Sequence, residues 1–115
     1  MSRLITGNSN VGVSLTFPGD NPVTVAVGAS IKTSDDYAIF GSKDVAWSVT
    51  NLGTLAGSGY GVTLFGTGTV TNGNSSGLAA SISGGDYGVL INDALGTVVN
   101  NATIAATGTH GAGCF

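Results

Sequence analysis

Charged side chains are scarce in this 115-residue chain. They make up 8% of the sequence, whereas an ordinary soluble domain has roughly 25%. Its three basic residues are Arg3, Lys32 and Lys43, and it has no glutamate. Proteins bind nucleic acids and anionic membranes through clusters of Lys and Arg. Three scattered cations cannot form such a cluster, so the composition excludes nucleic acid as a partner.

Cysteine and long apolar runs are also rare. The single cysteine, Cys114, has no partner for an internal disulfide, so its thiol is either incidental or forms an intermolecular bridge. No stretch approaches the roughly 18 apolar residues of a membrane helix, and we expect no membrane insertion. The first ten residues lack the apolar core of a secretory signal, and residues 108–115 stop within another repeat. We therefore expect residues 1–115 to be a single β-solenoid domain that is either a fragment of a longer protein or an uncapped stack of repeats.

Glycine and alternating apolar residues are abundant. The chain has 20 glycines, and its polar character comes mainly from Ser, Thr and Asn. Apolar residues alternate with polar ones in residues 23–27, 45–49 and 60–65, which is typical of short strands. No apolar stripe at helical spacing is free of glycine. These patterns predict an all-β protein.

Two phrases recur along the chain in the same order. The first contains a valine and an asparagine, and it occurs at residues 49–55, 70–78 and 98–104, with a degraded copy at 25–31. The second begins with an aromatic residue, Tyr37, Tyr60 or Tyr87, and we expect Val11 and His110 to take this position in the first and last copies. The resulting spacing is 23 to 27 residues.

A repeat of this length predicts a solenoid. A propeller blade needs about 40 residues, and the leucine signature of leucine-rich repeats is missing. We therefore predict a single right-handed parallel β-helix of about five coils, each of 23–27 residues with three short strands. Each coil closes its hydrogen bonds only on its neighbours, so equivalent side chains must stack. The expected ladders are Val49, Val70 and Val98; Asn51, Asn72 and Asn100; and Tyr37, Tyr60 and Tyr87.

The repeats at residues 47–73 and 86–111 resemble the passenger repeats of bacterial autotransporter adhesins and haemagglutinin-like extracellular β-helices. In those families a phrase like "GTVTN-GTI" and then "GYGV" recurs many times. The resemblance implies a right-handed β-helix on the bacterial cell surface or outside the cell. It also implies an export signal upstream and a membrane barrel downstream. It brings no catalytic residues to this chain.

No motif for a reaction is present. The acids that precede the aromatic position, Asp36 and Asp86, are the nearest approach to the carboxylate pair of a glycosidase, but Asp is also a common turn residue. We therefore expect no catalytic, cofactor-binding or metal-binding residues. Ice binding would require regular Thr-x-Thr ladders, and the patch at residues 67–71 has no counterpart in every coil.

The leading functional expectation is a non-enzymatic adhesive solenoid. It would bind a glycan or another host-surface ligand through Tyr, Asn and Asp at its turns. The alternative is a subunit that self-associates end to end into filaments, because no capping segment is evident. A polysaccharide-degrading β-helix enzyme is a remote third reading, which a cluster of acids on one face would favour.

Overall fold

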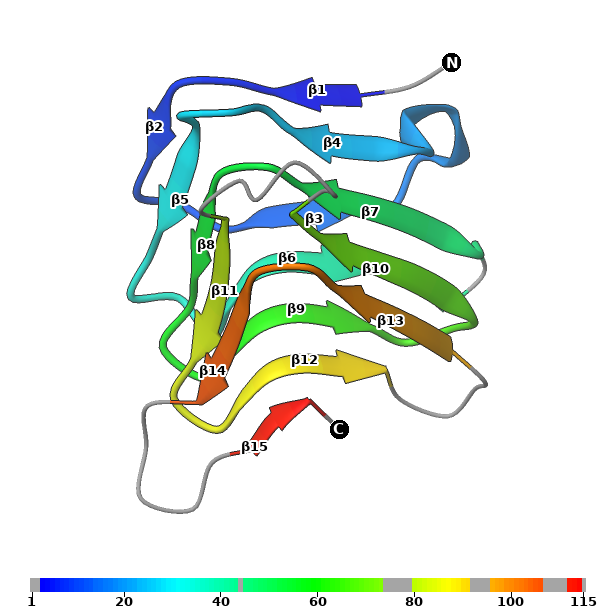
Figure 1. Cartoon of the computed structure of the whole chain (residues 1–115). Coiled ribbons are helices and arrows are strands. Elements are labelled where there is room, and N and C mark those ends of the chain that lie inside the picture. Colours follow the sequence, from blue (N-terminus) through cyan, green and yellow to red (C-terminus); the bar gives the residue numbers. More distant parts are fainter. Residues whose placement is uncertain (1–2, 44, 74–79, 92–95, 107–111, 115) are drawn as a thin grey trace.

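The chain winds into three parallel β-sheets, each with five strands (Figure 1). The computed structural model describes residues 3–43, 45–73, 80–91, 96–106 and 112–114. Sheet A consists of β1 (Arg3–Ile5), β4 (Val23–Val25), β7 (Trp47–Asn51), β10 (Gly68–Asn72) and β13 (Gly96–Asn100). Sheet B consists of β2 (Asn8–Ser9), β5 (Ser30–Lys32), β8 (Thr54–Ala56), β11 (Ser81–Gly84) and β14 (Thr103–Ala106). Sheet C consists of β3 (Val13–Leu15), β6 (Tyr37–Gly41), β9 (Tyr60–Leu64), β12 (Tyr87–Ile91) and β15 (Ala112–Cys114).

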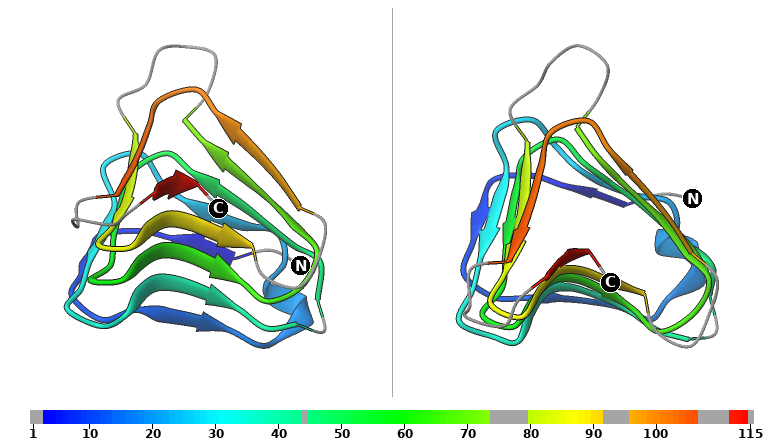
Figure 2. Two further views of the ribbon diagram at one scale, coloured as in Figure 1. Left: turned by 90° about the horizontal axis from the view of Figure 1, so that it is seen from below. Right: turned by 60° about the horizontal axis from the view of Figure 1, so that its bottom comes forward.

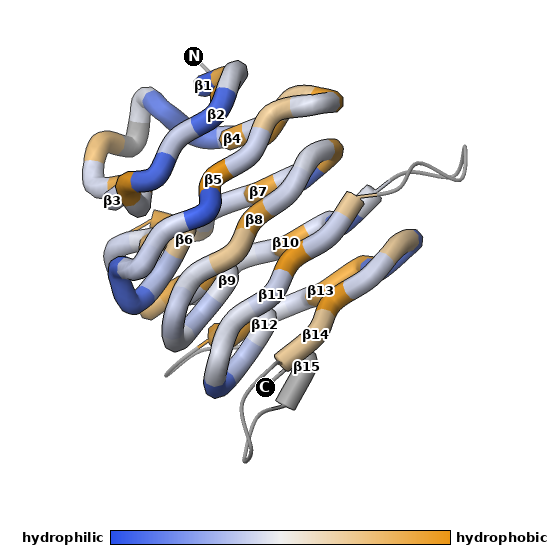
Figure 3. The backbone as a smooth tube through the Cα atoms, turned by 90° about the vertical axis from the view of Figure 1, so that its left-hand side faces the viewer, coloured by the Kyte–Doolittle hydropathy of each residue, from blue (hydrophilic) through white to orange (hydrophobic). Residues whose placement is uncertain are grey.

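Successive strands belong to successive sheets, so every three strands make one coil. Viewed along the stack, the coils trace a three-sided outline around a common interior (Figure 2). Figure 3 faces sheet B and shows its strands as side-by-side rungs. The fold confirms the predicted all-β parallel solenoid with three short strands per coil. The one short helical element described is a 3₁₀ turn, Pro18–Asp20. Within the described residues, no helix has the length and apolarity to cross a bilayer.

The interior is filled by one apolar side chain above another. Val49 pairs in register with Val70, which pairs with Val98. Val49 and Val70 are fully buried, and Val98, in the last strand of sheet A, is half-buried. The largest buried side chain, Trp47, fits beside Gly41, where a Cβ would lie 2.6 Å from the indole. The core is therefore close-packed around small residues as well as aliphatic ladders.

An asparagine closes the corner between sheets A and B in two of the coils. Oδ1 of Asn51 accepts a hydrogen bond from the backbone N–H of Gly53 at 3.1 Å. Oδ1 of Asn100 accepts one from the N–H of Ala102, also at 3.1 Å. The side chain imitates a backbone turn, so the chain passes from sheet A to sheet B through only two residues.

The same asparagines bond to one another through the stack. Nδ2 of Asn51 donates to Oδ1 of Asn72, and Nδ2 of Asn72 donates to Oδ1 of Asn100, each at 3.0 Å. The two amides also donate to the backbone carbonyls of Ser81 and Thr103. Asn51 and Asn72 are fully buried, and these bonds offset the cost of removing their amides from water.

The corner between β4 and β5, where valine stands in place of the asparagine, departs from the sequence alignment. Aligning residues 25–31 with 49–55 places Val25 opposite Val49. The structure instead pairs Val23 with Val49 and Val25 with Asn51. The first half of that alignment was therefore wrong by two residues, although the second half agrees with the register of sheet B.

The reason is the length of the corner. The corner after β4 takes four residues, 26–29, whereas the corner after β7 takes two, 52–53. A backbone hydrogen bond from the N–H of Ala29 to the carbonyl of Ala26 closes this turn at 3.0 Å. Gly28 takes φ 81° within it, a conformation that glycine adopts without steric cost.

Candidate aromatic binding groove

The strands of sheet C bend, and the bend brings aromatic side chains together outside. In β6, Ala38 and Ile39 are buried in succession, so the inward–outward alternation breaks. Tyr37 and Phe40 both remain half-exposed, and their ring centroids lie 5.1 Å apart. The arched course of β6, β9 and β12 is visible in Figure 2.

A glycine makes this bend possible in the next coil. Gly61 follows Tyr60, as Ala38 follows Tyr37 in the paired strand. A Cβ on Gly61 would contact the Ile82 side chain and would lie 2.6 Å from the carbonyl oxygen of Gly88. Only a residue without a side chain fits at position 61, whereas β6 makes the same bend with Ala38.

The predicted tyrosine ladder lies along this bend. Tyr37 pairs in register with Tyr60, and Tyr60 with Tyr87. The rings of Tyr60 and Tyr87 are stacked, with centroids 5.8 Å apart and planes 9° from parallel. The fourth position is held by Ala112, which pairs with Tyr87. The expectation of His110 at that position was therefore wrong, and His110 itself lies outside the described residues.

Phenylalanines extend the aromatic surface. Phe65 follows β9 and is 40% exposed, and its ring meets that of Phe40 edge to face at 5.1 Å. Together these side chains enclose a groove of about 250 Å³. We call it the aromatic groove; it is lined by Asp36, Tyr37, Phe40, Tyr60, Thr63, Phe65 and Leu90.

A buried hydroxyl lies in the wall of the aromatic groove. Thr63 shares an outward column with Phe40 and Leu90, yet it is only 3% exposed. Its Oγ1 is the one buried side-chain oxygen or nitrogen without a hydrogen-bond partner among the described residues. Leaving such a group unpaired costs about 1–3 kcal/mol. The burial of Oγ1 also keeps it out of reach of a molecule in the groove, so the hydroxyl belongs to the packing beneath the groove.

The charge of the aromatic groove comes from aspartate alone. Asp36 lines it, and no Lys or Arg does. The neighbouring Asp35 is used structurally, because its carboxylate accepts a hydrogen bond from the N–H of Gly12 at 3.1 Å. Asp86 precedes Tyr87 at the same corner but is two strand spacings from Asp36, or about 9.6 Å. One carboxylate therefore lies in the aromatic groove itself.

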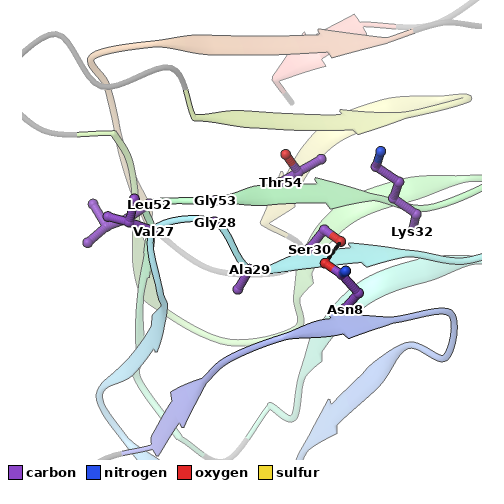
Figure 4. A pocket seen from close by; sticks show the side chains of 9 residues that line it. All are labelled: Asn8, Val27, Gly28, Ala29, Ser30, Lys32, Leu52, Gly53 and Thr54. Carbon is purple, nitrogen blue, oxygen red and sulfur yellow. Dashed lines mark hydrogen bonds between the residues drawn. The ribbon is translucent and has the colours of Figure 1, made fainter.

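A second hollow, of about 350 Å³, lies at the corner of sheets A and B (Figure 4). It is open because Gly28 and Gly53 carry no side chains; a Cβ on Gly53 would contact the carbonyl of Ala29. Within it, the Ser30 hydroxyl donates to Oδ1 of Asn8 at 2.8 Å. This hollow has no aromatic lining and follows from the packing of the corner.

The sequence named the three tyrosines but missed Phe40, Phe65 and Thr63. One feature of the sequence could have indicated the bend that brings these residues together. In "YAIF" and "YGVT" two inward residues separate two outward ones, a spacing of three that departs from the strand period of two. Among the described residues, no group of three or more His, Cys, Asp or Glu side chains is placed to hold a metal ion.

Comparisons with protein-family models, with curated proteins and with solved structures gave no match for this chain. The fold and the groove define the protein as a three-sided parallel β-solenoid that bears an aromatic groove on one sheet.

Proposed function

We propose that this chain is a non-enzymatic adhesive β-solenoid whose aromatic groove binds neutral glycans outside the cell. The observation that carries the proposal is the groove itself: partly exposed aromatic rings line it beside the exposed carboxylate of Asp36. Sugars present an apolar face of C–H groups and an edge of hydroxyls. The first suits a flat ring, and the second suits a carboxylate that can accept hydrogen bonds.

The electrostatics of the groove favour uncharged sugars. Asp36 is exposed, makes no side-chain hydrogen bond within the described structure, and is free to accept from a sugar hydroxyl. Asp86 adds negative charge near the stacked tyrosines, and the whole chain carries a net charge of −3. Uronic acids and sulfated sugars would be repelled, because no cation lines the groove.

A binding role also accounts for the arrangement of acids better than catalysis does. Glycoside cleavage uses two carboxylates that flank the scissile bond, and Asp36 is the one carboxylate that lines the groove among the described residues. In an adhesin-like protein, such as the autotransporter passengers that the repeats resemble, the rigid stack of coils would hold this groove away from the cell surface.

Calorimetric titration with neutral and uronic-acid oligosaccharides tests the proposal. We expect binding of neutral oligosaccharides and none of the acidic ones. Tyr60→Leu removes a flat ring from the groove but keeps an apolar side chain, and it should abolish binding. Phe17→Leu is the matched control, because Phe17 is 60% exposed and lies outside the groove. Equal binding by Tyr60→Leu and the parent, or no binding of any neutral glycan, would overturn the proposal.

A further inference from the structure

The outward side of sheet A carries two columns of hydroxyl side chains. Thr24, Thr50 and Thr71 stack in register in one column. Ser48, Thr69 and Thr97 stack in the other. We call these six residues the hydroxyl face. The inward neighbours of these residues are the buried valines and asparagines of the core, which hold the strands in place.

The hydroxyl face is a two-dimensional lattice. Adjacent strands lie about 4.8 Å apart, and outward residues two positions apart along a strand lie about 6.8 Å apart. Strands β4, β7, β10 and β13 lie side by side in Figure 1 and form one side of the three-sided outline in Figure 2. The hydroxyls therefore repeat at a fixed interval in both directions.

The hydroxyls of this face are free to meet a ligand. Within the described structure, none of the six makes a side-chain hydrogen bond to the protein, and all are at least partly exposed. The lattice contains no charged side chain. The column of Thr24, Thr50 and Thr71 ends in an apolar residue on each side: Leu4 lies beside Thr24, and Val99 lies beside Thr71.

Sheet B shows that this pattern is not a general property of the strands. One of its outward columns also holds hydroxyls, at Ser30, Thr54, Ser81 and Thr103. Its other column contains Lys32, Ala56 and Ser83, which break the lattice with a charge and a methyl group. Threonine favours strands in general, which would place it on every sheet; the doubled column occurs on sheet A alone among the described strands.

We propose that the hydroxyl face binds ice. A rigid lattice of hydroxyls, flanked by the threonine methyl groups, would hold water molecules in a regular two-dimensional array, which is the arrangement that an ice surface presents. The protein has already ordered these groups on folding, so little further entropy is lost when they meet the crystal. The Thr-x-Thr phrase at residues 69–71 is not repeated in every coil. In the folded protein, however, Ser48, Thr50 and Thr97 lie beside Thr69 and Thr71 on the neighbouring strands and extend the lattice.

Inhibition of ice recrystallisation by the purified protein tests this proposal. We expect the parent protein to slow crystal growth. Thr50→Lys places a charged, strongly hydrated group in the lattice and should abolish the effect. Thr54→Lys is the matched control: it adds the same charge to the same coil, on sheet B, and should leave the effect unchanged.

A second pair of variants shows whether the result depends on one substituted position. Thr69→Lys should lose the activity, and Ser81→Lys should keep it, with circular dichroism confirming that all four variants fold. Binding of neutral glycans should be the same in the four variants, because none of these residues lines the aromatic groove. An inactive parent protein, or an equal loss in the sheet B variants, would overturn the proposal.

Discussion

Replacing Thr63 by valine should stabilise the protein and leave glycan binding unchanged. Valine keeps the β-branched shape of threonine, so the strand preference and the packed volume change little. The substitution removes a buried Oγ1 that has no partner in the described structure. The cost of such an unpaired group is about 1–3 kcal/mol, and the free energy of unfolding should rise by about that amount.

Stability and glycan binding are measured separately. Equilibrium denaturation in urea gives the free energy of unfolding, and a rise in the melting temperature of about 4 °C per kcal/mol is expected for a domain of this size. Calorimetric titration with the neutral glycan should show unchanged binding, because the Thr63 hydroxyl is buried beneath the groove and does not reach its surface.

A control separates the hydroxyl from the methyl group of Thr63. Thr63→Ser keeps the hydroxyl and removes a buried methyl, so it should destabilise the protein by about 1 kcal/mol. If Thr63→Val were instead no more stable than the parent, the hydroxyl would already be hydrogen-bonded in the folded protein. The reasoning from its burial would then be refuted.

Two further predictions concern the stack of coils. Asn72→Ala removes three hydrogen bonds, those with Asn51, Asn100 and Thr103, and should lower the free energy of unfolding by about 3 kcal/mol. Asn100 is at an exposed position, so Asn100→Ala should lower this free energy by less than half as much. Equal losses for the two variants in urea denaturation would contradict the view that the buried part of the asparagine ladder stabilises the protein. The outer strand of sheet A, β13, has four exposed residues out of five, which leaves an edge that can pair with another copy of the protein. We predict that particles seen by negative-stain electron microscopy lengthen as protein concentration rises. Particles of constant size would argue against self-association.

Much of the fold was predictable because a solenoid repeats its own sequence. Stacked coils require equivalent residues at equivalent places, so Val49 and Val70, or Asn51 and Asn72, could be aligned from the text alone. The alignment failed where a corner changes length. Val25 lies opposite Asn51 because its corner is two residues longer, and a repeat that has lost its asparagine gives no sign of this in advance.

The aromatic groove was predictable only in part. Its tyrosines belong to the repeat and were found by their spacing. Phe40 and Phe65 do not recur from coil to coil, so comparison of repeats passed over them. Thr63 is a strand residue at an outward position, and only the packing around it shows that its hydroxyl is buried. The hydroxyl face was missed for a related reason, since its columns join Ser48 to Thr69 across coils.

The corner after Asn72 shows where this architecture accepts change. Residues 73–80 connect β10 to β11, whereas two residues suffice after Asn51 and after Asn100. Ser81 nevertheless pairs with Thr54 on one side and Thr103 on the other. A foreign peptide inserted at this corner should leave the stacking of the coils undisturbed. Variation during evolution, and the display of grafted epitopes by design, therefore have a site at which length is not constrained by the neighbouring coils.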